Sequence, residues 1–244
     1  MDVRVFATPD ETARALAERI ARLIAAKPDA ALGLPTGKSP VATYAELRRM
    51  YEAGLVDFSR VRTFNLDEFA GIGPSHPGSF RRFMDEHLFR HVNLPATHIQ
   101  FLNGATPDLD AECARYEEAI TAVGGIDLQF LGIGANGHIG FNEPAEGLCA
   151  HTHVAELQEA SREANAQWFG GDWTKVPERA LSMGMATILN ARQIVLMATG
   201  AEKADAVYGM IEGLITTRLP ASILQVHPRV TVMVDRQAAE RLSG

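Results

Sequence analysis

Features that mark membrane, secreted or nucleic-acid-binding proteins are scarce in this sequence. No apolar run approaches the roughly 20 residues that a membrane-spanning helix needs, so we expect no membrane partner. The first residues show no secretory or transit pattern, and we expect a cytoplasmic location. Two cysteines, Cys113 and Cys149, lack CxxC spacing, which favours reduced thiols over a disulfide framework or a metal site.

Basic residues are also outnumbered. The chain has 23 Lys and Arg against 30 Asp and Glu, and its formal charge is −7. A nucleic-acid-binding surface needs a clustered basic face, whereas Lys and Arg are scattered here, so we expect no nucleic-acid partner. Any anionic ligand must therefore be held by local chemistry.

The sequence does contain a regular alternation of two hydrophobic periods. Short β-like runs are followed by longer stretches in which apolar residues recur every three to four positions. At the start of the first longer stretch, Thr8, Pro9 and Glu11 form a capping box, which predicts a helix from there to about Ala26. The remaining predicted strands are 2–7, 30–35, 61–66, 99–102, 128–134, 194–199 and 230–235, and the remaining helices are about 40–53, 79–91, 108–123, 160–169 and 202–214.

This alternation predicts an α/β fold. Several predicted strands are apolar throughout, which fits burial on both faces of a largely parallel sheet. We therefore expect a Rossmann-like, three-layer α/β/α sandwich that forms one domain over residues 1–244. Ligands bind beyond the carboxyl ends of the strands in such sheets, so the residues after 30–35, 61–66 and 128–134 should meet in one cleft.

One segment departs from the alternation. Residues 146–154 are polar and irregular, and a predicted helix and glycines follow them. We expect this region, about 145–171, to form a lid over the cleft.

The first of the three loops at the cleft, Leu34-Pro35-Thr36-Gly37-Lys38-Ser39-Pro40, connects a predicted strand to a predicted helix. Backbone N–H groups and the positive end of the helix macrodipole meet at such a turn, which makes it a candidate phosphate site. The loop lacks the glycine spacing of a Walker A motif. Taken alone, it fits equally well an ordinary turn in which Thr36 or Ser39 caps the helix.

The second loop places two acids, Asp67 and Glu68, at the end of an apolar strand in FNLDEF. Successive side chains of an extended chain point to opposite sides, so only one of the two can face the cleft. That carboxylate is a candidate catalytic group. The alternative is a surface pair that caps the loop leading to Gly71 and Gly73.

The third loop is the glycine-rich stretch GIGANGHIGFNEP, which contains His138 and Glu143. Its glycines permit close approach of the backbone to a ligand, although their spacing is not a dinucleotide-binding fingerprint. A histidine ordinarily titrates near neutral pH, and a nearby glutamate can orient it for acid–base work. The alternatives are a structural histidine or a metal site with His151 and His153; no cysteine or acid has zinc spacing, so we expect no metal.

Three further segments accompany these loops along the chain, namely HPGSF, ALSMGMATIL and ATGAEKADAV. Together with LGLPTGKSP, FNLDEF and GIGANGHIGFNEPA, they make almost the whole chain resemble the glucosamine-6-phosphate deaminase (isomerising) family. The phosphate loop alone also resembles the related 6-phosphogluconolactonases. The resemblance implies a Rossmann-like sheet and conversion of glucosamine 6-phosphate and water to fructose 6-phosphate and ammonia in amino-sugar catabolism, with neither metal nor coenzyme.

Such a reaction opens the sugar ring, removes the proton at C2 and delivers a proton to C1, so it needs a positioned base and acid. The resemblance implies that Asp67 is the base, that His138 assists ring opening and that Glu143 holds the imidazole in the required tautomer. Many family members have an aspartate two residues before the histidine. This chain has Asn136, which can orient a neighbour but cannot carry charge.

The resemblance also implies the residues that bind the substrate phosphate, namely Thr36, Gly37, Lys38, Ser39 and Lys203. Family members usually have an arginine that reaches the phosphate where this chain has Gln167, and commonly a glycine where it has Lys38. The cation at position 38 is therefore a candidate replacement for the one missing at position 167. Some longer members are activated by N-acetylglucosamine 6-phosphate through basic residues after the NEP motif; this chain has His151 and His153 there, so we expect no such activation.

Other functions remain open at this point. A 6-phosphogluconolactonase would use the phosphate loop and the histidine but would give Asp67 no role. A galactosamine-6-phosphate deaminase would differ in the stereochemistry of its sugar. Sugar-phosphate-sensing domains of transcription regulators bind without turnover but carry a helix-turn-helix before the fold, whereas this chain begins with a predicted strand. Whether the protein is a monomer or a homo-oligomer cannot be decided from the sequence.

Overall fold

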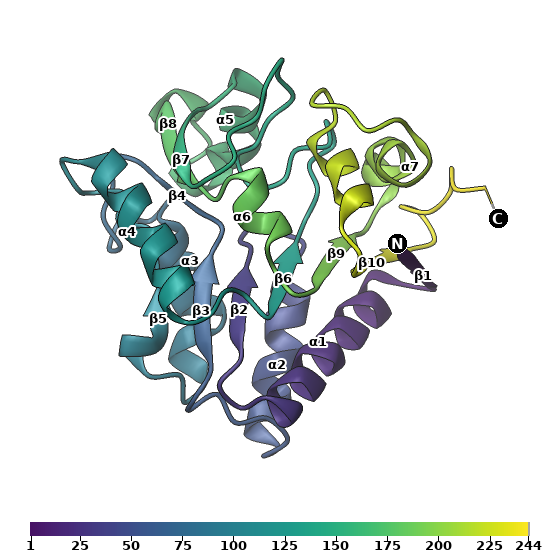
Figure 1. Cartoon of the computed structure of the whole chain (residues 1–244), viewed down its shortest axis with the longest axis horizontal. Coiled ribbons are helices and arrows are strands. Elements are labelled where there is room, and N and C mark those ends of the chain that lie inside the picture. Colours follow the sequence, from purple (N-terminus) through teal and green to yellow (C-terminus); the bar gives the residue numbers. More distant parts are fainter. Residues whose placement is uncertain (244) are drawn as a thin grey trace.

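The computed structural model describes residues 1–243, in which seven strands form one central sheet (Figure 1). Their order is β1-β10-β9-β6-β2-β3-β5, and every neighbouring pair is parallel, which confirms the predicted largely parallel sheet. The strands are β1 (Asp2–Phe6), β2 (Ala31–Leu34), β3 (Arg62–Asn65), β5 (Ile99–Gln100), β6 (Leu128–Leu131), β9 (Ile194–Ala198) and β10 (Val230–Asp235).

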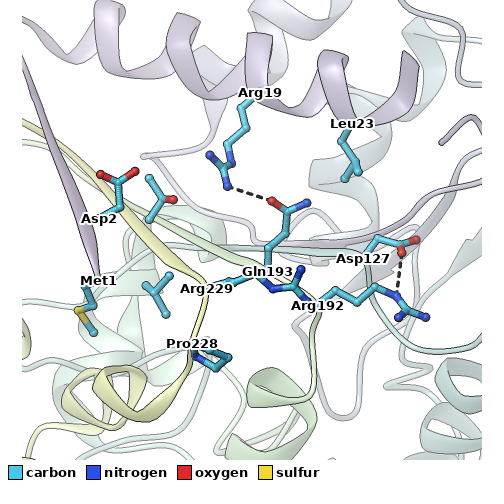
Figure 2. Close-up of a pocket in the computed structure, with 11 residues that line it drawn as sticks. Met1, Asp2, Arg19, Leu23, Asp127, Arg192, Gln193, Pro228 and Arg229 are labelled. Atoms are coloured by element: carbon cyan, nitrogen blue, oxygen red, sulfur yellow. Dashed lines mark hydrogen bonds and ion pairs between the residues drawn. The ribbon is translucent and has the colours of Figure 1, made fainter. Parts of the chain in front are cut away.

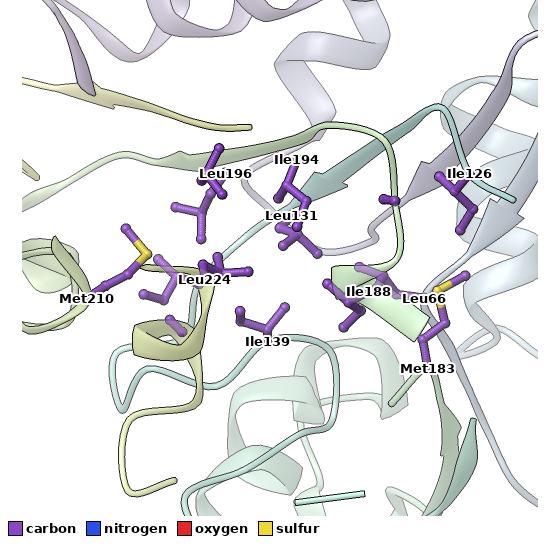
Figure 3. Close-up of a cluster of buried hydrophobic side chains, with 14 of the residues drawn as sticks. Leu66, Ile126, Leu131, Ile139, Met183, Ile188, Ile194, Leu196, Met210 and Leu224 are labelled. Carbon is purple, nitrogen blue, oxygen red and sulfur yellow. The ribbon is translucent and has the colours of Figure 1, made fainter. Parts of the chain in front are cut away.

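Helices cover both faces of this sheet, which confirms the predicted three layers. Alternate residues of β9 show the arrangement: Val195 and Met197 pack with the helices of one face, and Ile194 and Leu196 pack with those of the other. Figure 3 shows part of the apolar cluster that contains Ile194 and Leu196. The first face is covered by α1 (Pro9–Ala26), α2 (Val41–Glu52) and α3 (Phe80–His87), and the second by α4 (Leu109–Ala122), α6 (Met185–Leu189) and α7 (Ala204–Glu212).

Helix α1 begins and ends where the sequence predicts. The Thr8 hydroxyl accepts a hydrogen bond from the backbone N–H of Glu11 at 3.2 Å, and the helix ends at Ala26. The Glu11 carboxylate accepts the N–H of Ala7 at 3.0 Å rather than that of Thr8, so the reciprocal half of the capping box is displaced by one residue.

A second, smaller sheet lies beyond the carboxyl ends of the parallel strands, and the sequence did not predict it (Figure 1). Its three strands pair antiparallel in the order β4-β8-β7. An aromatic cluster packs with them, in which the ring of Phe69 lies 4.7 Å from Phe80, 5.6 Å from Phe141 and 5.3 Å from Phe169 between centroids. The strands are β4 (Asp67–Phe69), β7 (His153–Glu156) and β8 (Arg179–Ser182).

Several predicted boundaries were wrong. The segment 146–154 is not irregular throughout, because β7 begins at His153. The predicted strand 128–134 ends at Leu131, where its pairing ends and the glycines begin. Three predicted helices each contain a 3₁₀ turn: α3 is followed by Phe89–His91, α5 (Glu159–Asn165) is followed by Ala166–Phe169, and α7 is preceded by Ala201–Lys203.

Two predictions about absent features can be compared with the structure. Both cysteines are free, with Cys113 buried and Cys149 exposed. Within residues 1–243, each helix is too short or too polar to cross a membrane.

Candidate active site

A cavity of about 480 Å³ lies beyond the carboxyl ends of the parallel strands, and all three loops contribute to its wall. The small sheet contributes through Asp67, and the segment around α5 contributes from the side. Two residues that the sequence analysis assigned to the site, Asn136 and Glu143, do not line the cavity. The other assigned residues all do: Thr36, Gly37, Lys38, Ser39, Asp67, His138, Gln167 and Lys203.

The first loop presents its backbone to this cavity. Buried Tyr44 donates its hydroxyl hydrogen to the carbonyl of Pro35, and Gly37 adopts a φ of 101°, which favours glycine. Pro40 occupies the N-cap of α2, and no side chain within residues 1–243 caps this helix, so neither Thr36 nor Ser39 is a cap. The N–H of Val41 donates to the carbonyl of Lys38 at 3.3 Å, so the next N–H groups of the first turn and the positive helix end are the ones available to an anion.

Asp67 contributes a buried carboxylate to the cavity wall. The residue is 7% exposed, and its side chain forms no hydrogen bond or ion pair with any residue among 1–243. Burial, and secondarily the charge of Glu68, raises the pKa of Asp67 to about 8. A Cβ built on Gly140 would lie 3.5 Å from Asp67 Oδ2, so the third loop runs directly beside this carboxylate.

Glu68 points away from the cavity and caps a helix. Its carboxylate accepts hydrogen bonds from the N–H groups of Phe69, Phe80 and Arg81 at 2.9–3.0 Å. The hydroxyl of Ser79 donates a fourth at 2.7 Å. Burial raises the pKa of Glu68, and these hydrogen bonds oppose the shift. The adjacent acids thus face opposite surroundings, one with no partner and one with four.

His138 is half-buried in the third loop and lines the cavity. A Cβ on Gly134 would lie 2.3 Å from the imidazole Cε1, so the ring packs directly on the glycine backbone. Burial, and secondarily the charge of Lys203, lowers the pKa of His138 to about 4. The expectation that it titrates near neutral pH was therefore wrong, and the imidazole is neutral at pH 7.

The two residues assigned to orient His138 do not contact its ring. The Asn136 side chain is exposed, and its Oδ1 accepts the backbone N–H of His138 at 3.2 Å. Glu143 is 8% exposed, and both its carboxylate oxygens are buried with no hydrogen-bond partner within residues 1–243. The Nδ1 atom of His138 is likewise buried without a partner there. An ion pair or hydrogen bond between Glu143 and His138 is thus not formed in this structure.

Two lysines reach the cavity from different loops. Lys203 follows β9, and burial lowers its pKa while the carboxylate of Glu202 acts in the opposite sense. The turn before it is held by Asp235, whose carboxylate oxygens accept the Gly200 N–H at 3.1 and 3.2 Å. Lys38 lines the same cavity from the first loop, although its side chain is largely exposed. Neither ammonium group forms an ion pair within residues 1–243.

Several cavity residues were not found by the sequence analysis. Gln167 is joined by Ser161, Asn165 and Trp168 from the same segment. Their sequence shows only a helical period, which gives no indication of what the helix faces. Glu202 also lines the cavity, and its position directly before Lys203 was the available signal.

Comparisons with known proteins agree with this arrangement. The profile of the family described as "Glucosamine-6-phosphate isomerases/6-phosphogluconolactonase" matches residues 7–233. "Glucosamine-6-phosphate deaminase 2" of Bacillus subtilis (strain 168) is 52% identical over 236 residues, which cover 96% of this chain and 95% of that protein.

Solved structures extend the comparison. A structure of a monomeric glucosamine-6-phosphate deaminase has a TM-score of 0.95 and 42% identity, over 98% of this chain and 99% of the other. The 6-phosphogluconolactonase of Trypanosoma brucei has a TM-score of 0.75 and 22% identity, over 99% of this chain and 98% of the other, and shares the fold. The chain belongs to the family of glucosamine-6-phosphate isomerases and 6-phosphogluconolactonases.

Proposed function

We propose that this protein is a glucosamine-6-phosphate deaminase, which converts glucosamine 6-phosphate and water to fructose 6-phosphate and ammonia. The observation that carries the proposal is the unpaired, buried carboxylate of Asp67, which shares one cavity with a neutral imidazole and two lysines. The identities of 52% and 42% to deaminases over nearly the whole chain support the same activity.

The phosphate binds at the first loop, where the helix end, the backbone N–H groups and the two ammonium groups attract a dianion. Lys38 supplies part of this charge, because Gln167 is neutral. This placement orients the sugar across the cavity toward Asp67 and His138, which lie on the other two loops.

Ring opening falls to His138. A neutral imidazole can take the proton of the C1 hydroxyl and return it to the ring oxygen as the bond from C1 to that oxygen breaks. Glu143 serves this step as a positioning residue if its carboxylate turns toward Nδ1, since both groups are buried without partners. Asn136 acts through the backbone of His138, to which it is already bonded.

Asp67 acts as the acid–base group in isomerisation and deamination. Its carboxylate removes the C2 proton of the open aldehyde while a proton of the substrate ammonium passes to O1, which gives an enolamine. The protonated Asp67 then delivers its proton to C1, which leaves an iminium at C2. Water adds to C2 and ammonia departs, so the product is the ketose. In the empty site the raised pKa keeps Asp67 largely protonated at pH 7, and the ammonium group of the substrate favours its ionised form.

Two further features belong to the same proposal. The segment 145–171 acts as a lid, which is supported by the five residues around α5 that line the cavity. We also propose a cytoplasmic location, where phosphorylated sugars are available.

The proposal is tested by incubating purified protein with glucosamine 6-phosphate and measuring ammonia and fructose 6-phosphate. Galactosamine 6-phosphate and 6-phosphogluconolactone are the two comparison substrates. Hydrolysis of the lactone removes no carbon-bound proton, so a lactonase would give buried Asp67 no task. Ammonia released from glucosamine 6-phosphate at the highest kcat/KM is the expected result, and faster turnover of either comparison substrate would contradict it.

A further inference from the structure

A second cavity, of about 570 Å³, lies at the opposite end of the parallel sheet (Figure 2). It is bounded by helix α1 and by the chain that enters β6, β9 and β10, so it is separated from the candidate active site by the length of the strands. We call it the arginine recess, and its charged and amide residues are Asp2, Arg19, Asp127, Arg192, Gln193 and Arg229.

The acids of the arginine recess are already neutralised. Asp127 accepts hydrogen bonds from Lys27 Nζ at 2.7 and 2.8 Å, and Arg192 Nε lies 3.1 Å from it (Figure 2). The backbone N–H of Ala31 donates to the same carboxylate at 2.8 Å. Asp2 pairs with Arg4 at 2.9 Å. These acids therefore have closer partners than Arg19 and Arg229, although the charge of Asp2 also acts on Arg19.

Arg19 and Arg229 lack such compensation. Arg19 extends from α1 and donates one hydrogen bond, from Nη2 to Gln193 Oε1 at 2.9 Å, while its Nε is buried without a partner within residues 1–243 (Figure 2). The side chain of Arg229 forms neither a hydrogen bond nor an ion pair in that range. Arg19 Nε is closed off from the cavity, so the donors that an added acceptor can reach are Nη1 of Arg19, which forms no hydrogen bond within residues 1–243, and the guanidinium of the exposed Arg229.

We propose that the arginine recess binds a small metabolite through an oxyanion, either a phosphate or a carboxylate. A guanidinium presents parallel N–H donors that match two oxygens of such a group, and Arg19 and Arg229 offer these donors from opposite sides of one cavity. The volume of about 570 Å³ leaves room for the body of a sugar phosphate or a tricarboxylate beside the oxyanion.

The test distinguishes binding in the arginine recess from binding in the candidate active site by the segments that each protects. Inorganic phosphate and citrate are titrated into the full-length protein by calorimetry, and hydrogen–deuterium exchange is followed with each. Binding in the arginine recess slows exchange in 15–24 and 191–195, whereas binding in the active site slows it in 34–42. Slower exchange in the first two segments with at least one probe is the expected result, and the effective probe identifies the oxyanion.

Three variants make the result specific. Arg19→Gln and Arg229→Gln each weaken this binding about tenfold or more, because each removes charge-assisted hydrogen bonds. Arg14→Gln, which changes the same charge on the exposed side of α1, leaves it unchanged. The side chain of Arg229 is exposed and forms no hydrogen bond or ion pair within residues 1–243, so its variant tests binding even if Arg19→Gln unfolds. The proposal is overturned if neither probe protects the recess segments, or if Arg229→Gln binds both probes as tightly as the wild type.

Discussion

The two ends of the parallel sheet carry charged cavities that differ in how their acidic residues are paired. At the carboxyl end, Asp67 at the start of β4, Lys203 in the turn after β9 and Lys38 in the loop after β2 form no ion pair within residues 1–243. At the amino end, Asp127 lies between Lys27 and Arg192, and these pairs brace the entries to β6 and β9. The same sheet therefore leaves Asp67, Lys203 and Lys38 without ion pairs at its carboxyl end, whereas at its amino end the ion pairs of Asp127 lie beside the unpaired Arg19 and Arg229.

This difference in pairing explains why some buried side chains of the protein are reactive. A side chain left without partners in a buried place has a strongly shifted pKa, as seen for Asp67 and His138. Glu68, next to Asp67 in sequence, has four hydrogen bonds that oppose such a shift. The reactivity of a buried side chain thus depends on which hydrogen-bond and ion-pair partners it lacks. Substitutions at positions with and without such partners distinguish a reactive group from a structural one.

The largest effect is expected from Asp67→Asn, which keeps the shape of the side chain but removes the base. A general base contributes roughly 10²–10⁴-fold, so kcat should fall by that factor while KM changes little. Steady-state kinetics with glucosamine 6-phosphate measure it. Glu68→Gln is the matched control, because it disturbs the cap of α3 and should lower thermal stability more than kcat. A loss below tenfold in Asp67→Asn would reject Asp67 as the base.

His138→Gln should come next and should separate two steps. Without the imidazole, ring opening loses its acid–base group, so turnover of the cyclic substrate should fall by about 10²-fold. An open-chain analogue of the substrate bypasses that step and should lose much less. Equal losses on the cyclic and open-chain compounds would contradict the assignment of His138 to ring opening.

The pH dependence of stability provides a third test of the unpaired carboxylate. The pKa of Asp67 is about 8 in the folded protein against about 3.9 in unfolded chains, so between these values the folded state binds more protons. The free energy of unfolding should therefore fall, through this group, as the pH rises from about 4 to 8. Asp67→Asn removes this titration, so its stability relative to wild type should increase by a few kcal/mol over that window.

Urea denaturation of both proteins at pH 5 and pH 8 measures this difference. Asp29→Asn, at an exposed acid, serves as the control and should show no such trend. If the difference between Asp67→Asn and wild type is the same at both pH values, the carboxylate is not titrating in that window.

The smallest expected effect concerns the charge of the phosphate site. Lys38→Gly removes a cation from the cavity wall and should raise KM about tenfold, because a charge-assisted hydrogen bond contributes on the order of 1.5–3 kcal/mol. Adding Gln167→Arg should recover much of that loss, since both positions line the same cavity. Lys175→Gly, at an exposed lysine outside the cavity, should leave KM unchanged. An unchanged KM in Lys38→Gly would mean that its ammonium group remains in solvent.

The sequence predicted the parallel sheet and the three loops because these depend on local patterns. Short apolar runs such as 194–199 alternate with stretches of helical period, and the three loops directly follow the runs 30–35, 61–66 and 128–134. The small sheet could not be predicted in this way. Its strands have three or four residues, and β4 pairs with β8, which lies more than a hundred residues further along the chain.

The protonation states of the site residues also could not be predicted from the sequence. The neutrality of His138 depends on burial and on Lys203, which reaches it from a different strand. Likewise, the separate environments of Asp67 and Glu68 depend on Ser79 and the N-terminus of α3. The arginine recess carries no motif at all, because Arg19 and Arg229 are brought together only by the pairing of distant strands.

The position of β1 at the edge of the sheet has a consequence for synthesis on the ribosome. This strand pairs with β10 and with no other strand, although the two lie at opposite ends of the described chain. β1 thus leaves the ribosome well before its partner β10 is made, and its exposed edge can meanwhile pair with other chains. Synthesis of β10, rather than early collapse, should therefore set when β1 reaches its native place.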